Sequence, residues 1–324
     1  MKALTLTAFG NSDVLEYKEI DNPVLKNGEI LVEMKTIGLN FADLMRRNGT
    51  YPMKGNAPYI NGFEGAGIVK DSNDHPEIKI GDRVAFADVP FANAELVAVP
   101  FENVIPLPDE ISFEIAASVM LQGLTAHYLT TDSHHVEPGE IVLIHAAAGG
   151  VGQLLIQICK LLSATVIGLT SSESKKETAL LLGADAVFLY DQDWTAQVLE
   201  IYPQGVDVVY ESIGITMESS LAVTKILGQV VLFGLAGGKL ELGNPLWIIA
   251  HSKTITGGDL WNYLTSKEER LIRSKLLFEW IISGKVKISE PTIFKLSDGK
   301  KAHDLMEARV STGKILMVPL SDNS

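Results

Sequence analysis

Apolar and polar residues alternate along the N-terminal part of the chain, in short segments that glycine, proline and asparagine separate. Alternation with a period of two predicts strands that bury one face. The segments with this pattern are 1–9, 30–34, 67–69, 83–86 and 94–99. Short strands at such spacing predict an antiparallel, barrel-like all-β unit that extends to about residue 120.

The pattern changes near residue 123, and from Ile141 onward short apolar runs alternate with longer amphipathic segments. The short runs predict strands at 141–145, 165–169, 186–189, 206–211 and 229–233. The segment after the first run carries apolar residues at helical spacing, namely Val151, Leu154, Leu155, Ile158, Leu161 and Leu162. Strands that alternate with helices predict βαβ units and a parallel sheet.

The C-terminal part continues with a helical segment at 267–283 and a strand at 314–318. This tail is too short to form a domain of its own, so we expect it to fold back onto the N-terminal unit. Within its helix, the charged run Glu268, Glu269 and Arg270 is typical of a solvated face.

Composition narrows the class of protein. The chain has 324 residues, 46% of them hydrophobic and 21% charged, as in globular proteins. At roughly 150 residues per domain, this length predicts about two domains. The net charge of −13 argues against a nucleic-acid partner, because neutralising phosphates requires an excess of Lys and Arg. The one cysteine, Cys159, excludes an internal disulfide and a cysteine-rich zinc site, and its place beside the apolar helix face predicts a packed thiol.

No apolar run approaches the roughly 20 residues that span a bilayer. The first residues alternate like a strand and lack the sustained apolar run of a signal peptide. We therefore expect no membrane partner and a cytoplasmic location.

The segment from His145 to Gly152 is a glycine-rich turn between a predicted strand and a predicted helix. In this context it predicts a dinucleotide-binding turn, with small residues at the three fingerprint positions: Ala147, Gly149 and Gly152. The pyrophosphate would lie at the helix N-terminus, bound by Ala147, Gly149, Gly150, Val151 and Gly152. The alternative is a tight turn that binds no ligand.

The residues after the second strand of this unit bear on the choice of cofactor. An NAD site has an acid at the end of that strand, which binds the ribose hydroxyls. Here Ser171 follows the strand and Lys175 lies shortly after it, so a 2′-phosphate would find donors. This favours NADPH as the cofactor, although the nearby Glu173 leaves use of NADH open.

Several further motifs lie in a fixed order along nearly the whole chain. They are 38–43 (GLNFAD), 49–52 (GTYP), 62–67 (GFEGAG), 81–84 (GDRV), 122–126 (QGLTA), the turn at 145–152, and 211–214 (ESIG). In this order and spacing the chain resembles the zinc-free quinone oxidoreductases, the zeta-crystallin-like branch of the medium-chain dehydrogenase/reductases. The resemblance implies an α/β fold with a GroES-like, β-rich catalytic domain at 1–123 and 265–324, interrupted by a doubly wound Rossmann domain at 124–264.

The resemblance also implies that no metal is bound. In zinc-dependent relatives a cysteine stands at the position of Asn40 and a histidine at that of Phe63. Neither residue here is a ligand in the usual three-ligand arrangement of catalytic zinc. The four-cysteine lobe that holds structural zinc in such relatives is missing as well.

The same resemblance assigns roles to individual positions. Asn40 and Tyr51 match residues that line the nicotinamide and quinone pocket, where they would orient rather than transfer protons. The positions that would grip the 2′-phosphate are Lys175, Tyr190 and Arg309, and the segment passing the nicotinamide is Phe233–Gly234. Where relatives carry tyrosine and polar residues, this chain has Met45, Leu235 and Ala236, which makes the expected pocket more apolar.

Three polar residues or pairs allow two interpretations each. His134 and His135 could hold a metal, but a loop location without a third ligand is favoured. His145 is predicted to be a hydrogen-bonded residue at a strand end rather than a catalytic acid. Glu64 is predicted to be a buried carboxylate that ties backbone segments together rather than a general base.

The resemblance and the cofactor motif together predict an NADPH-dependent reductase of quinones or related conjugated carbonyls such as enones. One alternative is a 2-alkenal or enoyl-thioester reductase on the same scaffold, with Tyr51 as the candidate proton donor. Another is an NADPH-binding structural or regulatory protein with little turnover. The strand-like segment 253–256 also predicts a homodimer that pairs through an exposed strand edge.

Overall fold

The computed structural model describes residues 1–240, 242 and 245–319. The chain forms two compact units, which we describe separately. Unit 1 comprises Met1–Leu121, Leu264–Ile282 and the segment from Ile288 onward, and unit 2 comprises Gln122–Tyr263 and Ser283–Lys287. The expected domain boundaries, at 123/124 and 264/265, lie within two residues of these. The segment Ser283–Lys287, which joins unit 2, was not expected there.

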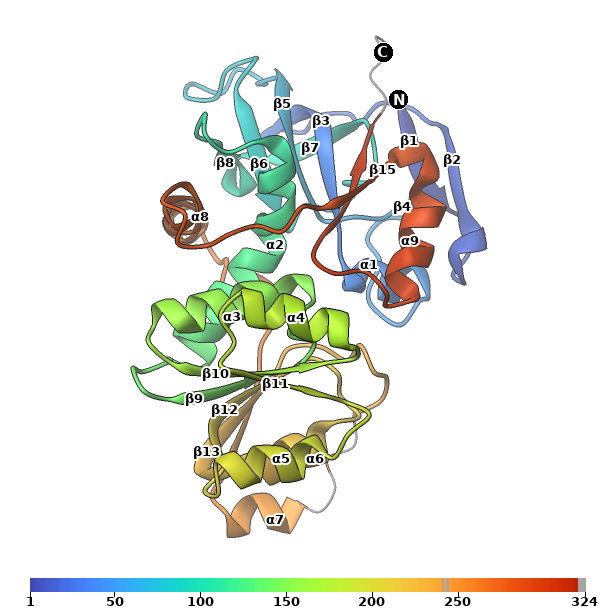
Figure 1. The fold of residues 1–324 in the computed structure, drawn as a ribbon. Coiled ribbons are helices and arrows are strands. Elements are labelled where there is room, and N and C mark those ends of the chain that lie inside the picture. Colours follow the sequence, from blue (N-terminus) through green and yellow to red (C-terminus); the bar gives the residue numbers. More distant parts are fainter. Residues whose placement is uncertain (241, 243–244, 320–324) are drawn as a thin grey trace. The chain divides into compact units, whose positions relative to one another are not determined.

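Unit 1 is built mainly of antiparallel strands (Figure 1). Its strands are β1 (Lys2–Leu6), β2 (Leu15–Glu19), β3 (Glu29–Leu39), β4 (Tyr59–Ile60), β5 (Glu64–Asp71), β6 (Arg83–Ala87), β7 (Leu96–Pro100), β8 (Ile105–Pro106), β15 (Thr292–Lys295) and β16 (Ile315–Val318). They form one sheet in the order β2-β1-β4 and another in the order β15-β16-β3-β5-β6-β8, with β7 pairing β3. Its helices are α1 (Phe41–Arg47), α8 (Lys267–Ile282), α9 (Gly299–Glu307) and the first part of α2 (Phe113–Tyr128).

The C-terminal tail belongs to unit 1. Strand β16 pairs antiparallel with β3, with Ile315 opposite Leu39 and Met317 opposite Ile37. These residues are buried in the same apolar core as Leu4 and Val97. The predicted return of the tail to the N-terminal unit is therefore confirmed.

Unit 2 is a parallel sheet with helices on both faces. Its strands are β9 (Ile141–Ile144), β10 (Thr165–Thr170), β11 (Ala186–Leu189), β12 (Val206–Glu211), β13 (Thr224–Leu232) and β14 (Thr254–Gly257). Its helices are α3 (Gly150–Leu161), α4 (Glu173–Leu181), α5 (Trp194–Ile201), α6 (Met217–Val223), α7 (Pro245–Ala250) and the end of α2. Helices α3 and α4 lie on one face of the sheet and α5 and α6 on the other (Figure 1).

The strand order of this sheet is β11-β10-β9-β12-β13-β14. This is the doubly wound order of a Rossmann domain, in which the direction of winding reverses between the first and fourth strands. Here the reversal falls between β9 and β12, whose parallel pairing is visible in the register of Leu143 with Val209. Ligands of such sheets bind at the carboxyl ends of the strands beside this point.

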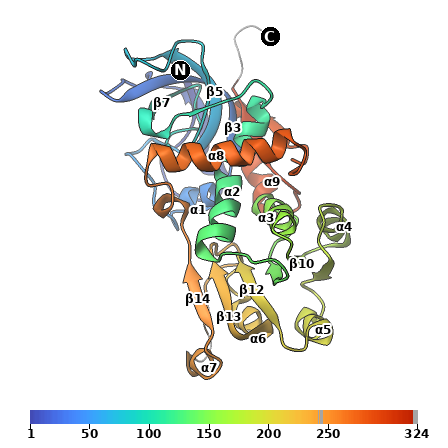
Figure 2. The ribbon, with the colours of Figure 1, turned by 90° about the vertical axis from the view of Figure 1, so that its left-hand side faces the viewer.

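One surface expectation was wrong. The guanidinium of Arg270, on α8, is buried in unit 1 and forms an ion pair with Asp88 at 3.4 Å. Helix α8 contacts β8 and the short 3-10 helix Phe101–Asn103, so this turn of the helix faces protein rather than water. Figure 2 shows α8 along its length. Glu269, one residue away, instead pairs with Arg273 on the partly exposed side.

Strand β14 is an edge of the sheet in unit 2, because it pairs with β13 alone among the described strands. It overlaps the segment 253–256 from which we expect a homodimer, and the dimer stays a prediction. In the described part of the chain no helix is long and apolar enough to cross a membrane.

A close approach at Gly152 lets α3 pack against the end of β9. A Cβ atom on Gly152 would lie 2.4 Å from the Ala146 carbonyl oxygen and 2.8 Å from the Ala147 Cα. Both neighbours are backbone atoms, which cannot move without displacing the turn. At Gly257, in the same unit, an added Cβ atom would meet no other atom within 4 Å, so this position has room for a side chain.

We predict that Gly152→Ala lowers the free energy of unfolding by about 1–3 kcal/mol, as forced overpacking does. The loss should occur although alanine favours helices more than glycine by about 1 kcal/mol. Thermal and urea unfolding measure it, with Gly257→Ala as the matched control. Equal stability of the two variants would contradict the close approach.

Candidate functional site

The glycine-rich turn of unit 2 connects β9 to α3. Ala146 has a φ of 48°, in the left-handed region, which costs a residue with a side chain about 1 kcal/mol or more. The amide of Gly149 donates to the Ala146 carbonyl oxygen at 2.8 Å, and that of Ala147 donates to Leu169 at 3.0 Å. These bonds fold the turn back beneath the first residues of α3.

The turn fits the pyrophosphate of a dinucleotide. Helix α3 has twelve residues and begins at Gly150, and the amides of its first turn have no partner within the helix. They point along the positive end of the helix dipole. A Cβ on Gly150 would lie 2.0 Å from the end of the Gln122 side chain, which would have to move aside. The predicted turn therefore has the backbone that such a ligand requires.

Ser171 and Lys175 lie together after β10. The Lys175 ammonium is 3.4 Å from the Ser171 hydroxyl, and the Lys175 amide donates to the Ser172 hydroxyl that caps α4. Glu173, on the same turn, is exposed and lies 3.9 Å from Lys176. A hydroxyl, an ammonium and a helix N-terminus suit a phosphate at this position.

Tyr190 points into unit 2. Its hydroxyl accepts a hydrogen bond from the Ala146 amide at 2.8 Å and lies 3.1 Å from His145 Nδ1. The two rings are stacked, with centroids 5.8 Å apart. The Tyr190 hydroxyl is thus bonded to the glycine-rich turn, and the assignment of Tyr190 to the 2′-phosphate stays a prediction.

His145 and Glu211 are both fully buried at the ends of β9 and β12. His145 Nε2 lies 2.8 Å from the Ser220 hydroxyl, which donates to Glu211 at 2.5 Å. Burial lowers the pKa of His145 despite the nearby charge of Glu211, so the ring is neutral at neutral pH. The prediction of a hydrogen-bonded histidine at a strand end is confirmed.

Glu211 also organises the turn after β12. Its carboxylate accepts the amides of Ile213 at 2.7 Å and Gly214 at 3.0 Å, and both of its oxygens accept from the Thr216 hydroxyl. The Glu211 carbonyl in turn accepts the amide of Phe233 at 3.0 Å. The segment Phe233–Gly234 is therefore held by the backbone of Glu211, whose side chain fixes the turn after β12.

In unit 1, Asn40 and Glu64 meet at the junction of β3, α1 and β5. Glu64 is fully buried, and it accepts the Leu121 amide at 2.6 Å and the Asn40 side-chain amide at 2.8 Å. Lys314, only 3% exposed, donates to Glu64 at 2.5 Å and to Asn40 Oδ1 at 2.8 Å. Glu64 is thus a buried carboxylate that ties separate segments together, as predicted.

Tyr51 lies beside a second buried pair of charges. The guanidinium of Arg46 is 3.1 Å from Asp43, 3.7 Å from the ring centroid of Phe63 and 4.9 Å from that of Tyr51. Burial raises the pKa of Asp43, and Arg46 and the Asn40 amide oppose this effect. Phe63 therefore packs on a cation in the position where zinc-dependent relatives would carry a histidine ligand.

Arg309 lies in unit 1, just after α9. It is exposed, has a φ of 57°, and its guanidinium is 5.9 Å from the Phe41 ring centroid. Its assignment to the 2′-phosphate stays a prediction.

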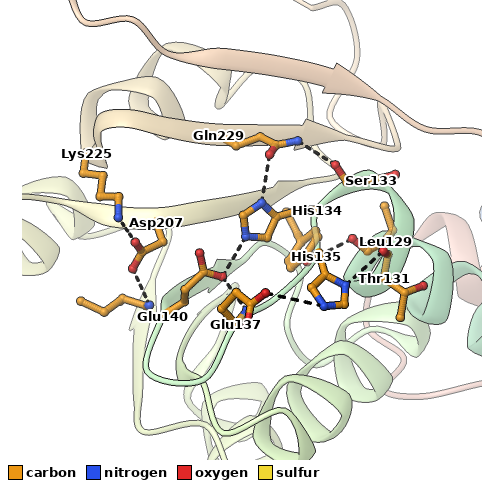
Figure 3. Close-up of polar contacts among 12 residues, drawn as sticks. Leu129, Thr131, Ser133, His134, His135, Glu137, Glu140, Asp207, Lys225 and Gln229 are labelled. Carbon is orange, nitrogen blue, oxygen red and sulfur yellow. Dashed lines mark hydrogen bonds and ion pairs between the residues drawn. The ribbon is translucent and has the colours of Figure 1, made fainter.

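Residues with metal-binding chemistry are engaged otherwise. His134 Nδ1 and Nε2 each lie 2.9 Å from an oxygen, of Gln229 and Glu140 respectively (Figure 3). His135 is exposed and approaches Glu137 at 3.7 Å. No group of three or more His, Cys, Asp or Glu in the described residues could hold a metal ion. Cys159 is fully buried, and burial raises its pKa well above the ordinary value.

The sequence analysis missed three residues of these clusters: Lys314, Arg46 and Ser220. Lys314 precedes an apolar strand, where a lysine is usually solvated, so the sequence carries no signal of its burial. Arg46 and Ser220 carry no signal either, because charged and hydroxyl residues on short helices are usually solvated.

The chain matches two family models. The alcohol dehydrogenase GroES-like domain matches residues 26–139, and the zinc-binding dehydrogenase model matches residues 150–273. The first covers most of the β-rich part of unit 1, and the second covers most of unit 2.

Individual relatives match over almost their full length. The quinone oxidoreductase of Salmonella typhimurium is 37% identical over 319 residues, covering 96% of this chain and 97% of its own. The 2-haloacrylate reductase of a Burkholderia species is 34% identical, covering 96% of each chain.

Among solved structures, that of Escherichia coli quinone oxidoreductase complexed with NADPH has a TM-score of 0.93 and 34% identity, covering 98% of this chain and all of the other. The matches run through both units, and the identity exceeds what fold alone requires. The chain belongs to the quinone oxidoreductase branch of the medium-chain dehydrogenase/reductase superfamily.

Proposed function

We propose that this protein is an NADPH-dependent reductase of quinones or related conjugated carbonyls, and that it works without zinc. Bound NADPH would supply the hydride, and the chain would supply binding, orientation and a shaped environment. The near full-length similarity to curated quinone oxidoreductases supports the reaction class.

The proposal that the enzyme works without zinc rests on the Asn40 side-chain amide, which is held at both ends by hydrogen bonds. Its nitrogen donates to Glu64 at 2.8 Å, and its oxygen accepts from Lys314 at 2.8 Å. Both ends of the amide are therefore fixed, which suits a residue that orients other groups. The Lys314 ammonium also places a positive charge beside the oxygen of Asn40, which disfavours a metal cation next to that oxygen.

NADPH is the proposed cofactor on the chemistry of unit 2. The first turn of α3 would bind the pyrophosphate through Gly149, Gly150, Val151 and Gly152, packed over Ala147. Ser171 and Lys175 would bind the 2′-phosphate. Two solved relatives complexed with NADPH support the choice. Phe233 and Gly234 would pass the nicotinamide, as the resemblance implies.

Activated alkenes are a second candidate class of acceptor, and one relative supports them. The 2-haloacrylate reductase relative covers as much of this chain as the quinone oxidoreductases do. Tyr51, held beside the Arg46 guanidinium, would orient either kind of conjugated acceptor. We therefore treat activated alkenes as the alternative substrates of the same site.

We predict that the purified protein oxidises NADPH with quinones such as 1,4-benzoquinone, and does not oxidise simple alcohols with NADP⁺. The reason is that conjugated acceptors need no metal to polarise a carbonyl. Absorbance at 340 nm measures the reaction, against a panel that adds 2-haloacrylates and 2-alkenals. Turnover of the alkenes alone would identify the alternative, and no turnover of any acceptor would contradict a reductase.

We predict that Lys175→Ala weakens NADPH binding about 10- to 100-fold, because a charge-assisted hydrogen bond contributes roughly 1.5–3 kcal/mol. NADH affinity should stay within about twofold, since NADH has no 2′-phosphate. Fluorescence titration with both nucleotides measures the two affinities. The matched control is Lys176→Ala, because Lys176 pairs with Glu173 on the same helix. An unchanged ratio of affinities would refute the assignment.

We predict that the protein purified without chelators contains well below one zinc per chain, and that EDTA leaves its activity unchanged. Elemental analysis by mass spectrometry gives the metal content. A stoichiometric zinc whose removal abolishes activity would overturn the zinc-free mechanism.

A further inference from the structure

His134 lies in the segment that leads from α2 into β9, and both of its ring nitrogens face oxygen atoms (Figure 3). Nδ1 is 2.9 Å from Gln229 Oε1, and Nε2 is 2.9 Å from Glu140 Oε2. The side chain of His134 is only 15% exposed. Protein oxygens rather than bulk water therefore determine where the ring needs protons.

The orientation of the Gln229 side-chain amide is fixed by its nitrogen. Nε2 lies 2.8 Å from the Ser133 carbonyl oxygen, which can only accept, and 2.8 Å from the Thr256 hydroxyl. If the amide were turned over, its oxygen would face the Ser133 carbonyl oxygen at this distance. The atom that faces His134 is therefore the amide oxygen, which needs a donor.

The second ring nitrogen faces a carboxylate. Glu140 Oε2 also accepts the Glu137 amide at 3.0 Å, and an ionised carboxylate has no proton to donate. Each nitrogen of His134 therefore needs a proton of its own, whereas a neutral imidazole carries only one. Either neutral tautomer would leave a bare nitrogen 2.9 Å from an oxygen.

The pair of His134 and Glu140 thus binds one proton more than a neutral ring beside a carboxylate. That proton lies on the ring, because imidazole binds protons more tightly than a carboxylate does. The pair is then an imidazolium and a carboxylate joined by a charge-assisted hydrogen bond. Since Glu140 is only 21% exposed, this charge replaces part of the hydration that the carboxylate loses.

Other charged groups near this pair have partners of their own. Asp207 of β12 forms an ion pair with Lys225 of β13. His135, which is exposed, approaches Glu137 at 3.7 Å. In the part of the chain that the structure describes, the imidazolium is therefore the cation that contacts the Glu140 carboxylate.

Two buried titratable groups also lie near Glu140, namely Tyr210 of β12 and Cys159 of α3. Burial raises the pKa of each well above its ordinary value, so both keep their protons at neutral pH. Asp132 is exposed and accepts the Thr131 hydroxyl at 2.7 Å. A change of charge near neutral pH at this place therefore falls on the imidazole ring.

Through Gln229 the ring takes part in contacts among three segments, which are 129–140, β13 and β14. Gln229 belongs to β13, and its amide nitrogen bonds both the Ser133 carbonyl and Thr256 of β14. The Tyr263 hydroxyl lies 3.2 Å from that of Ser133. If the ring loses one proton, a bare nitrogen faces an oxygen, and the bond that joins the first segment to β13 or the ion pair is lost.

We propose that His134 carries two protons in the folded protein at neutral pH, and that this charge holds segment 129–140 against β13 in a pH-dependent way. The inference goes beyond the proposed function, because it involves neither a nucleotide nor an acceptor. The charged ring stabilises the fold in neutral and weakly acidic solution. This contribution is lost as the pH rises and the ring of the folded protein releases its second proton.

The first experiment records ¹⁵N spectra of histidine-labelled protein at pH 7. Both nitrogens of His134 should be protonated in the wild type. In Glu140→Gln the new amide can donate to a bare Nε2, so the ring should be neutral with its proton on Nδ1. His134→Gln assigns the signal by its loss or, if that variant does not fold, nuclear Overhauser contacts with Gln229 assign it.

A wild-type ring with one bare nitrogen would overturn the proposal, and so would a Glu140→Gln ring that keeps both protons. The wild-type spectrum alone decides the protonation of His134, so the test does not depend on the variant folding. The exposed His135 gives an internal reference, whose signal should be nearly the same in both proteins.

The second experiment measures urea unfolding of the wild type and Glu140→Gln between pH 6 and pH 9. The unfolding constant of the wild type, divided by that of the variant, should rise with pH by at most tenfold per unit, the limit for one proton. The matched control is Glu137→Gln, which removes an exposed carboxylate and should leave this ratio within about twofold. A flat ratio for Glu140→Gln, or an equal rise for Glu137→Gln, would overturn the proposal.

These measurements are made without nucleotide, so they separate the two proposals. A protein that reduces no acceptor but carries both protons on His134 refutes the proposed function alone. A protein that reduces quinones with a neutral His134 refutes the inference about this ring alone.

Discussion

A carboxylate buried away from water must receive enough hydrogen bonds and positive charge to replace its lost hydration. This requirement shapes the candidate site in each unit. Glu211 meets it with the Ile213 and Gly214 amides and the Thr216 hydroxyl from the segment after β12, and with the Ser220 hydroxyl from α6. Glu64 meets it with one amide, one side-chain amide and the Lys314 ammonium. In both units, satisfying the carboxylate is what fixes the neighbouring segments.

The sequence predicted what depends on local pattern. The parallel strands of unit 2, the turn at 145–152 and the burial of Glu64 all followed from periodicity, glycine placement or motif context. Partners distant in sequence could not be predicted in this way. Arg270 was expected in solvent because its helix looks polar, yet tertiary packing brings it to Asp88. Likewise, nothing in the sequence indicates that the Tyr190 hydroxyl accepts a hydrogen bond from the Ala146 amide.

The departure of the turn from the usual glycine pattern also has a physical reason. Ala147 stands at the first fingerprint position and is fully buried without needing a left-handed backbone, which falls on Ala146 instead. The space for its methyl group comes from the neighbouring strand, where a Cβ on Gly168 would lie 2.9 Å from the Ala147 Cβ. Because β10 has glycine at position 168, the turn can have alanine at the first fingerprint position and still pack closely against the strand.

The connectivity of unit 1 follows from the same electrostatic requirement. Asn40 and Glu64 come from the first part of the chain, but the Lys314 ammonium that pairs with Glu64 lies 250 residues after it, directly before β16. Leaving such a carboxylate buried without its partner costs roughly 3–5 kcal/mol, a large share of the stability of an ordinary domain. The first 121 residues alone would therefore hold an uncompensated charge at the very position where Asn40 must be fixed. Unit 1 is therefore completed, and its candidate site ordered, only when the tail returns after unit 2 and supplies Lys314.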